Sequence, residues 1–172
     1  AWQDFPPSVP EPAFCTRWTV WVDLSAARKK GLEILKLFLT GAFDVAQADY
    51  GFLTTESDYK RKNFKVSYDG QGTVEEFLGD NPEKGIPGLY WMNLFGPLYV
   101  EWFGREHFKS LPATVIEPQS SGSVFIQFGE TPEAAEELDA QQRQKAAITD
   151  LGDEAFFDIN RPDRILKVPV LN

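Results

Sequence analysis

Alternating and continuous apolar segments along the chain predict a set of short strands. Residues 16–23 alternate, with Trp18, Val20 and Val22 on one side, which predicts a strand that turns one face to the core. Residues 88–95 form the most apolar segment and end at Gly96-Pro97, which predicts a buried strand. Further strands are expected over residues 50–55, 64–68, 113–117 and 124–128, with an edge segment over 165–170.

Apolar residues that recur at helical spacing predict three main helices. The first spans about residues 26–39, where Ile34, Leu35 and Phe38 are assigned to one apolar face and Ser25 to the N-cap. The second spans about 97–110, and the third about 132–148 with Thr131 as its N-cap. The segments between these elements are interpreted as a charged connection over 56–63, a short helix over 74–78 and a loop over 80–87.

This order of elements favours one fold class over another. Strands do not alternate strictly with long helices, so a doubly wound parallel sheet is disfavoured. We therefore predict an α+β domain over residues 14–172, with a mostly antiparallel sheet and about three helices packed on one face. Residues 1–13 hold four prolines and predict an extended arm.

Composition and charge narrow the function classes. The 172 residues include 26 acidic and 17 basic ones, for a net charge of −9, which argues against nucleic-acid binding and against attachment to anionic membranes. Aromatic residues make up 14%, too many for a disordered acidic chain. No apolar segment is long enough for a membrane helix, and the single cysteine suits a reducing compartment, so we expect a cytoplasmic protein.

Few residues are suited to catalysis or metal binding. Cys15 and His107 are the only cysteine and histidine, too few for a structural zinc site, and no motif indicates a cofactor. His107 is expected on the apolar face of the helix over 97–110, beside Phe103 and Leu111. Ser110 follows three residues later, a poor spacing for an activated nucleophile.

Two features indicate surfaces for binding. Residues 130–154 hold eight acidic and two basic residues, a net charge of −6, which predicts an electronegative patch that a basic partner could recognise. Aromatic residues crowd the segment 89–103, and not all of them fit into a core, so Tyr90 and Trp102 are candidate interface anchors. The acidic candidates within the patch are Glu133, Glu136, Glu137 and Asp139.

Three segments together resemble a known family. These are residues 86–106 (IPGLYWMNLFGPLYVEWFGRE), Asp49–Phe52 (DYGF) and Glu154–Asp158 (EAFFD). In layout they are similar to immunity proteins of bacterial polymorphic toxin systems, notably the immunity protein 52 family, over about residues 20–170. The resemblance implies a protein that binds a cognate toxin, and it transfers no functional residues.

The leading hypothesis is therefore a cytoplasmic immunity protein that covers the active site of a basic toxin, with a nuclease as the natural guess. One alternative is a small hydrolase or transferase that uses carboxylates and His107. Another is an accessory domain attached to a larger chain through the proline-rich arm. The sequence indicates neither the toxin nor the oligomeric state.

Overall fold

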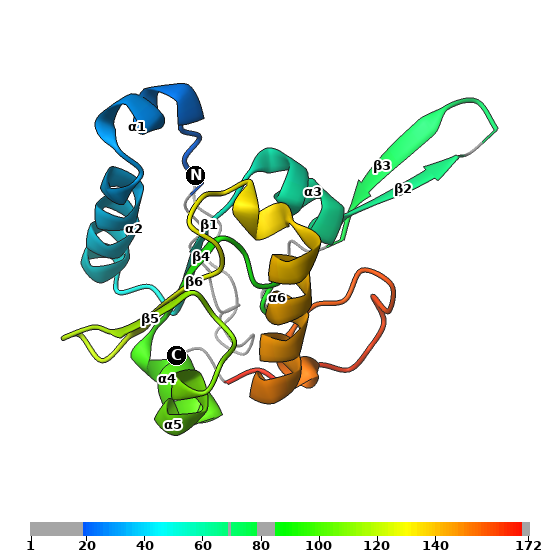
Figure 1. Cartoon of the computed structure of the whole chain (residues 1–172). Helices are drawn as coiled ribbons and strands as arrows, with labels where there is room; N and C mark the ends of the chain where they lie inside the picture. The colour runs from blue at the N-terminus through cyan, green and yellow to red at the C-terminus, as the bar shows by residue number, and fades with distance from the viewer. Residues whose placement is uncertain (1–18, 69, 79–84, 170–172) are drawn as a thin grey trace, which may run out of the picture.

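The computed structural model describes residues 19–68, 70–78 and 85–169, and a four-stranded antiparallel sheet lies at its centre (Figure 1). The predicted arm over 1–13 and Cys15 lie outside the described residues. The strand order is β1-β4-β6-β5, and all neighbours pair antiparallel. The predicted α+β class is confirmed. The strands are β1 (Tyr50–Leu53), β4 (Met92–Phe95), β5 (Val115–Pro118) and β6 (Val124–Gln127).

Six α-helices occur in the described part of the chain, where about three were expected. They are α1 (Leu24–Lys30), α2 (Glu33–Ala46), α3 (Glu56–Asn63), α4 (Pro97–Phe103), α5 (Arg105–Lys109) and α6 (Leu138–Leu151), with the short 3-10 turns η2 (Ala134–Glu136) and η3 (Asp153–Ala155). Two of the predicted helices are each divided by a glycine. Gly31 separates α1 from α2, and Gly104, at a φ of +83°, separates α4 from α5.

The helices cover both faces of the sheet, so the expectation that they pack on one face is wrong. Leu94 and Phe125 point to one face and join the cluster that contains Leu35 and Phe43 of α2. On the other face, Phe95 belongs to the cluster that α4, α5 and α6 complete. The central strands β4 and β6 are buried on both faces, and apart from Asn93 and Gln127 their residues are apolar, so their sequence does not alternate.

The N-terminal strand predicted over 16–23 is not formed in its described part, residues 19–23. The Asp23 carboxylate accepts a hydrogen bond from the backbone N–H of Ser25 at 2.8 Å and a longer one from Ala26, so Asp23 is the N-cap of α1 in place of Ser25. The described residues of this alternating segment have no regular secondary structure and lead into α1.

The charged segment 56–63 is the helix α3, contrary to its interpretation as a connection. The Thr55 hydroxyl accepts a hydrogen bond from the Asp58 N–H at 3.1 Å and caps this helix. Residues 73–77 form β3 (Thr73–Phe77) where a short helix was expected, and β3 pairs antiparallel with β2 (Phe64–Tyr68). Figure 1 shows this hairpin projecting from the body of the molecule.

The remaining differences between the predictions and the structure concern the residues at which strands and helices begin and end. Of the strand predicted over 88–95, only Met92–Phe95 pairs with neighbours, although the preceding residues are buried. The helix predicted over 132–148 begins at Leu138, because Glu137 adopts an extended backbone with a ψ of 153°. Thr131 instead accepts a hydrogen bond from Ala134 N–H at 3.2 Å, just before η2. The described residues of the tail, 165–169, form no strand.

Candidate functional site

Helix α2 carries an apolar stripe that faces solvent. Leu37 and Val45 are 69% and 83% exposed, and they share one helical face with Ile34, Phe38 and Gly41. These five residues are called the outer stripe below. In Figure 1, α2 stands at the edge of the molecule, with the sheet on one side only.

The outer stripe is a second apolar face on a helix that already has one. Leu35 and Phe43 are buried against the sheet, on the opposite side of α2. The sequence assigned Ile34 and Phe38 to one apolar face together with Leu35, but both are exposed whereas Leu35 is buried. A surface helix normally carries polar residues on its outer face, so large apolar side chains in one row there are typical of a binding surface.

The segment before α1 is also apolar and exposed. Trp21 is 72% exposed, and Val20 and Val22 on either side are exposed as well. A solvated tryptophan is among the side chains that most often anchor protein interfaces. The N-terminal part of the described chain therefore presents apolar side chains from both this segment and α2.

The four acidic residues predicted for partner binding lie together around η2 and the start of α6, but most of them already have partners. Glu133 pairs with Arg28, and Asp139 pairs with Arg143 at 3.0 Å. Glu136 accepts hydrogen bonds from the hydroxyls of Thr55 and Ser57. Glu137 is exposed, and its carboxylate makes no hydrogen bond or ion pair with the described residues.

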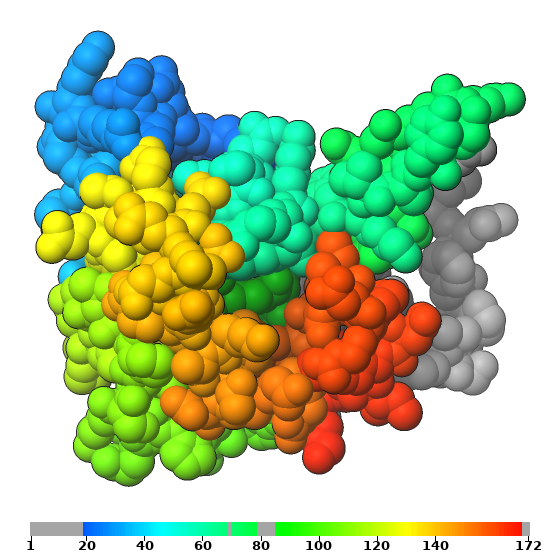
Figure 2. Space-filling view, turned by 45° about the vertical axis from the view of Figure 1, so that its right-hand side comes forward, coloured from blue at the N-terminus to red at the C-terminus, as the bar shows by residue number. Residues whose placement is uncertain are grey.

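The acidic residues border the first two helices. The pair between Arg28 of α1 and Glu133 joins the two regions, and Figure 2 shows α1 and α2 (blue) beside residues 130–137 (yellow). A hydrogen bond from its own backbone N–H, together with Arg28, lowers the pKa of Glu133 and keeps it charged. Lys29 and Lys30 at the end of α1 are exposed, so the rim of this surface carries both signs of charge.

The two aromatic candidates have different positions. Tyr90 is fully buried, where partial exposure was expected: its ring stacks on Phe52 at a centroid distance of 4.2 Å, and its hydroxyl accepts a hydrogen bond from Asn63 at 2.7 Å. Tyr90 is therefore part of the interior. Trp102 is 40% exposed on α4, at the opposite end of the molecule from α1 in Figure 1. The structure does not bring Trp102 together with the acidic residues.

His107 is exposed on α5, and its predicted position on the apolar face is wrong. The break at Gly104 changes the helical phase, so that Phe108 is buried in its place between Phe103 and Leu111. The Ser110 hydroxyl donates to the backbone carbonyl of His107 at 3.0 Å. Ser110 and His107 are therefore not arranged as a nucleophile and its base.

The sequence did not predict a buried polar network around Lys62. The Lys62 ammonium donates to the Asp58 carboxylate at 2.9 Å, to the Gln144 side chain at 2.9 Å and to the backbone carbonyl of Leu89. It also lies 4.6 Å from the centroid of the Tyr90 ring. The network joins α3 to α6 and to the segment before β4. The pattern Thr55-x-x-Asp58, a helix N-terminus motif, could have predicted α3.

The environment of Lys62 is that of a structural ion pair. Burial lowers the pKa of its ammonium, and the nearby Asp58 carboxylate opposes that shift. Asp58 is itself buried and accepts additional hydrogen bonds from Arg61 and Thr54. All three donor positions of the ammonium are thus engaged by groups of the protein, which leaves none directed at a substrate.

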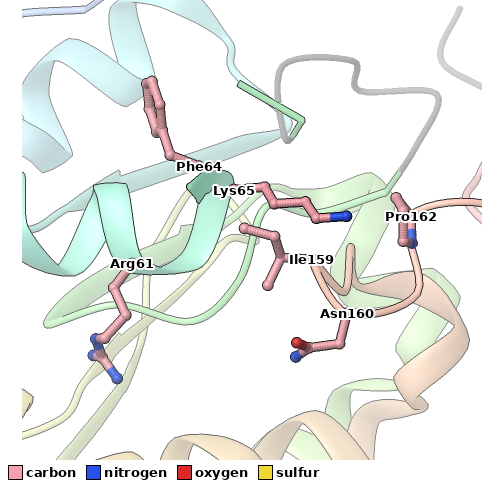
Figure 3. Close-up of a pocket in the computed structure, with 6 residues that line it drawn as sticks. All are labelled: Arg61, Phe64, Lys65, Ile159, Asn160 and Pro162. Atoms are coloured by element: carbon pink, nitrogen blue, oxygen red, sulfur yellow. The ribbon is translucent and has the colours of Figure 1, made fainter. Parts of the chain in front are cut away.

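Shallow hollows mark the described surface. One, of about 380 Å³, lies at the root of β2. Figure 3 shows Arg61 and Lys65 on one side of it, and Ile159, Asn160 and Pro162 on the other. The second, of about 440 Å³, is lined by α4 and α5 residues that include Glu101 and Arg105. Neither contains Lys62 or His107.

Within the described ranges, no three His, Cys, Asp or Glu side chains cluster closely enough to hold a metal ion. None of the helices placed by the structure is both long and apolar enough to cross a membrane.

Comparison with known proteins finds no matching family model, no matching curated protein and no matching solved structure. The resemblance to the immunity protein 52 family therefore stays a prediction from the sequence.

Proposed function

We propose that this protein acts by binding another protein through the outer stripe of α2. The observation that carries the proposal is the row of exposed apolar side chains, in which Leu37 and Val45 are the most exposed. Burying such side chains in an interface removes apolar surface from water, at about 25 cal/mol per Å². A helix with apolar residues on two opposite sides is expected to have both sides covered, here one by the sheet and the other by a partner.

The neighbouring charges indicate what kind of partner fits. Glu137, exposed beside the start of α6, and Glu130, exposed just before η2, add negative potential next to the apolar helices. A partner with an apolar patch edged by basic side chains would gain both contacts and faster association. Glu133, Glu136 and Asp139 contribute less, because their carboxylates already have partners within the chain.

The specific form of the proposal is neutralisation of a cognate bacterial toxin. It rests on the resemblance to immunity proteins and on the acidic segment, which suits a toxin with a basic active-site cleft. In this role the protein needs no chemistry of its own, because covering the cleft is sufficient to block a substrate.

Co-expression with toxins encoded beside the gene tests this function. We expect the wild-type protein to restore growth and to co-purify with one of them. The double substitution Leu37→Glu/Phe38→Glu places two charges in the outer stripe and should abolish both effects. Ile165→Glu is the matched control, because Ile165 is a 91% exposed apolar residue in the C-terminal segment.

The urea midpoints of both variants should match that of the wild type, since all the substituted positions are exposed. Failure of every neighbouring toxin to bind would contradict toxin neutralisation. Full binding by Leu37→Glu/Phe38→Glu would contradict the use of α2.

A further inference from the structure

The hairpin β2–β3 is a two-stranded sheet with no third strand in the described structure. It extends away from the main sheet in Figure 1, and Val66 and Tyr68 on β2 are exposed. Two strands alone are marginally stable in water, because too little apolar surface is buried between them. An exposed strand edge with apolar side chains is a template for a further strand.

Hydrogen bonding within the hairpin determines which backbone groups face outward. Leu78 N–H donates to the Asn63 carbonyl at 2.9 Å, so these two residues form a hydrogen-bonded pair. In an antiparallel ladder every second pair is hydrogen-bonded, and the next such pairs are therefore Lys65 with Glu76 and Ser67 with Val74. The backbone groups of Val66 and Tyr68 consequently point away from β3. Phe64 directs its carbonyl outward as well, whereas its N–H donates to the backbone carbonyl of Lys60 in α3.

We propose that β2 pairs antiparallel with β2 of a second copy of this chain, about a two-fold axis at Val66. In this register the two Val66 residues exchange both backbone hydrogen bonds, and Tyr68 N–H donates to the Phe64 carbonyl of the other copy. The result is a four-stranded sheet in which the two β2 strands are central. The inference is independent of the α2 surface and of the proposed function.

The side chains of β2 are self-complementary in this register. Phe64 faces Tyr68 of the other copy, an aromatic cross-strand pair, and Lys65 faces Ser67, so no like charges oppose each other. The same construction on the outer edge of β3 would place Glu75 directly opposite Glu75. Charge therefore selects the β2 edge over the β3 edge.

The hollow at the root of β2 has a place in the proposed dimer. When Tyr68 of one copy lies opposite Phe64 of the other, it comes next to that hollow, because Phe64 is one of the residues that line it (Figure 3). The hollow has a volume of about 380 Å³. Ile159 and Pro162 would supply apolar contacts to the Tyr68 ring there.

Sedimentation equilibrium over a range of protein concentrations tests the pairing. We expect a dimer with a dissociation constant in the micromolar range or weaker, as suits a small interface. Val66→Pro removes an N–H that points away from β3, so the hairpin itself keeps its hydrogen bonds while dimerisation weakens at least tenfold. Glu75→Pro is the matched control, because it removes the outward N–H at the paired position on the other edge.

Crosslinking gives a second measurement that does not depend on a proline. In a Cys15→Ser background, Val66→Cys should form a disulfide-linked dimer on oxidation, because the two residues meet at the axis. Ser67→Cys should crosslink much less, since it lies opposite Lys65. A wild-type protein that stays monomeric up to about 1 mM would overturn the inference. Equal loss of dimer in Val66→Pro and Glu75→Pro would also overturn it.

Discussion

Replacement of Lys62 by methionine tests whether the buried polar network holds α3 in place. Methionine keeps most of the apolar length of the side chain and removes only the ammonium. Lys62 is 19% exposed, and its ammonium donates to Asp58, Gln144 and the Leu89 carbonyl. The substitution therefore deletes these hydrogen bonds and the contact of the ammonium with the Tyr90 ring, while it largely preserves the volume of the side chain.

The expected loss follows from the acceptors left behind. The Leu89 carbonyl and the Gln144 side-chain oxygen lie on buried residues, and each unsatisfied acceptor costs about 1–3 kcal/mol. Asp58 keeps its contacts with Arg61 and Thr54, which limits the cost of the buried carboxylate. Relief from burying an ammonium offsets part of the loss, so we expect unfolding to become easier by about 3 kcal/mol. For a chain of this size that lowers Tm by about 6–12 °C.

Urea unfolding followed by circular dichroism measures this difference, with an unchanged m-value as the sign that only stability has altered. Lys60→Met is the matched control, because Lys60 lies two residues earlier on α3 and pairs with Glu56 in solvent. It should leave the urea midpoint at the wild-type value. If Lys62→Met costs no more than Lys60→Met, the network does not stabilise the fold and the reasoning is refuted.

Two further predictions concern alkaline pH and glycine positions. Burial lowers the pKa of Lys62 below 10.5, so between that lowered pKa and 10.5 the folded protein binds fewer protons than the unfolded one. Over this pH range the stability of the wild type should therefore rise relative to that of Lys62→Met. A difference in urea midpoint that stays constant with pH would contradict this prediction. Gly129→Ala should destabilise by about 1–3 kcal/mol, because its φ is +85° and a Cβ would lie 2.9 Å from the backbone nitrogen of Ala135. Gly41 lies on α2 with open space around it, so Gly41→Ala should instead stabilise the protein by about 0.5–1 kcal/mol. Thermal unfolding distinguishes the two variants, and a Gly129→Ala variant more stable than the wild type would contradict the close backbone approach at Gly129.

Local sequence patterns were sufficient for most of the strands and insufficient for several helices. The strands β1, β4 and β6 fall within predicted segments and β5 overlaps its segment, because short apolar runs bounded by Gly, Pro and polar residues have few alternative structures. Helix α3 was missed, because it has almost no apolar face, and what stabilises it is a set of contacts with distant residues. Its Lys62 reaches Gln144, 82 positions away in the sequence.

The candidate sites show the same division. The periodicity of Ile34, Leu35 and Phe38 correctly predicted a helix, but Leu35 is buried while the other two are exposed. A helical period shows which residues share a face, and it cannot show whether another element covers that face. Likewise, the acidic cluster was apparent from composition, whereas the pairing of Glu133 with Arg28, 105 positions away, depends on how the chain folds back.

By itself, the sequence determined the α+β class, most of the strands of the central sheet and the acidic character of residues 130–154, because each depends on residues close together in the chain. The tertiary structure alone decided that Tyr90 is interior, that His107 faces solvent and that α2 and β2 are left with uncovered apolar residues. The physical reason is that burial is a property of packing between distant segments. The chemistry of a side chain determines how much free energy its burial would gain, and only the fold determines whether it is buried.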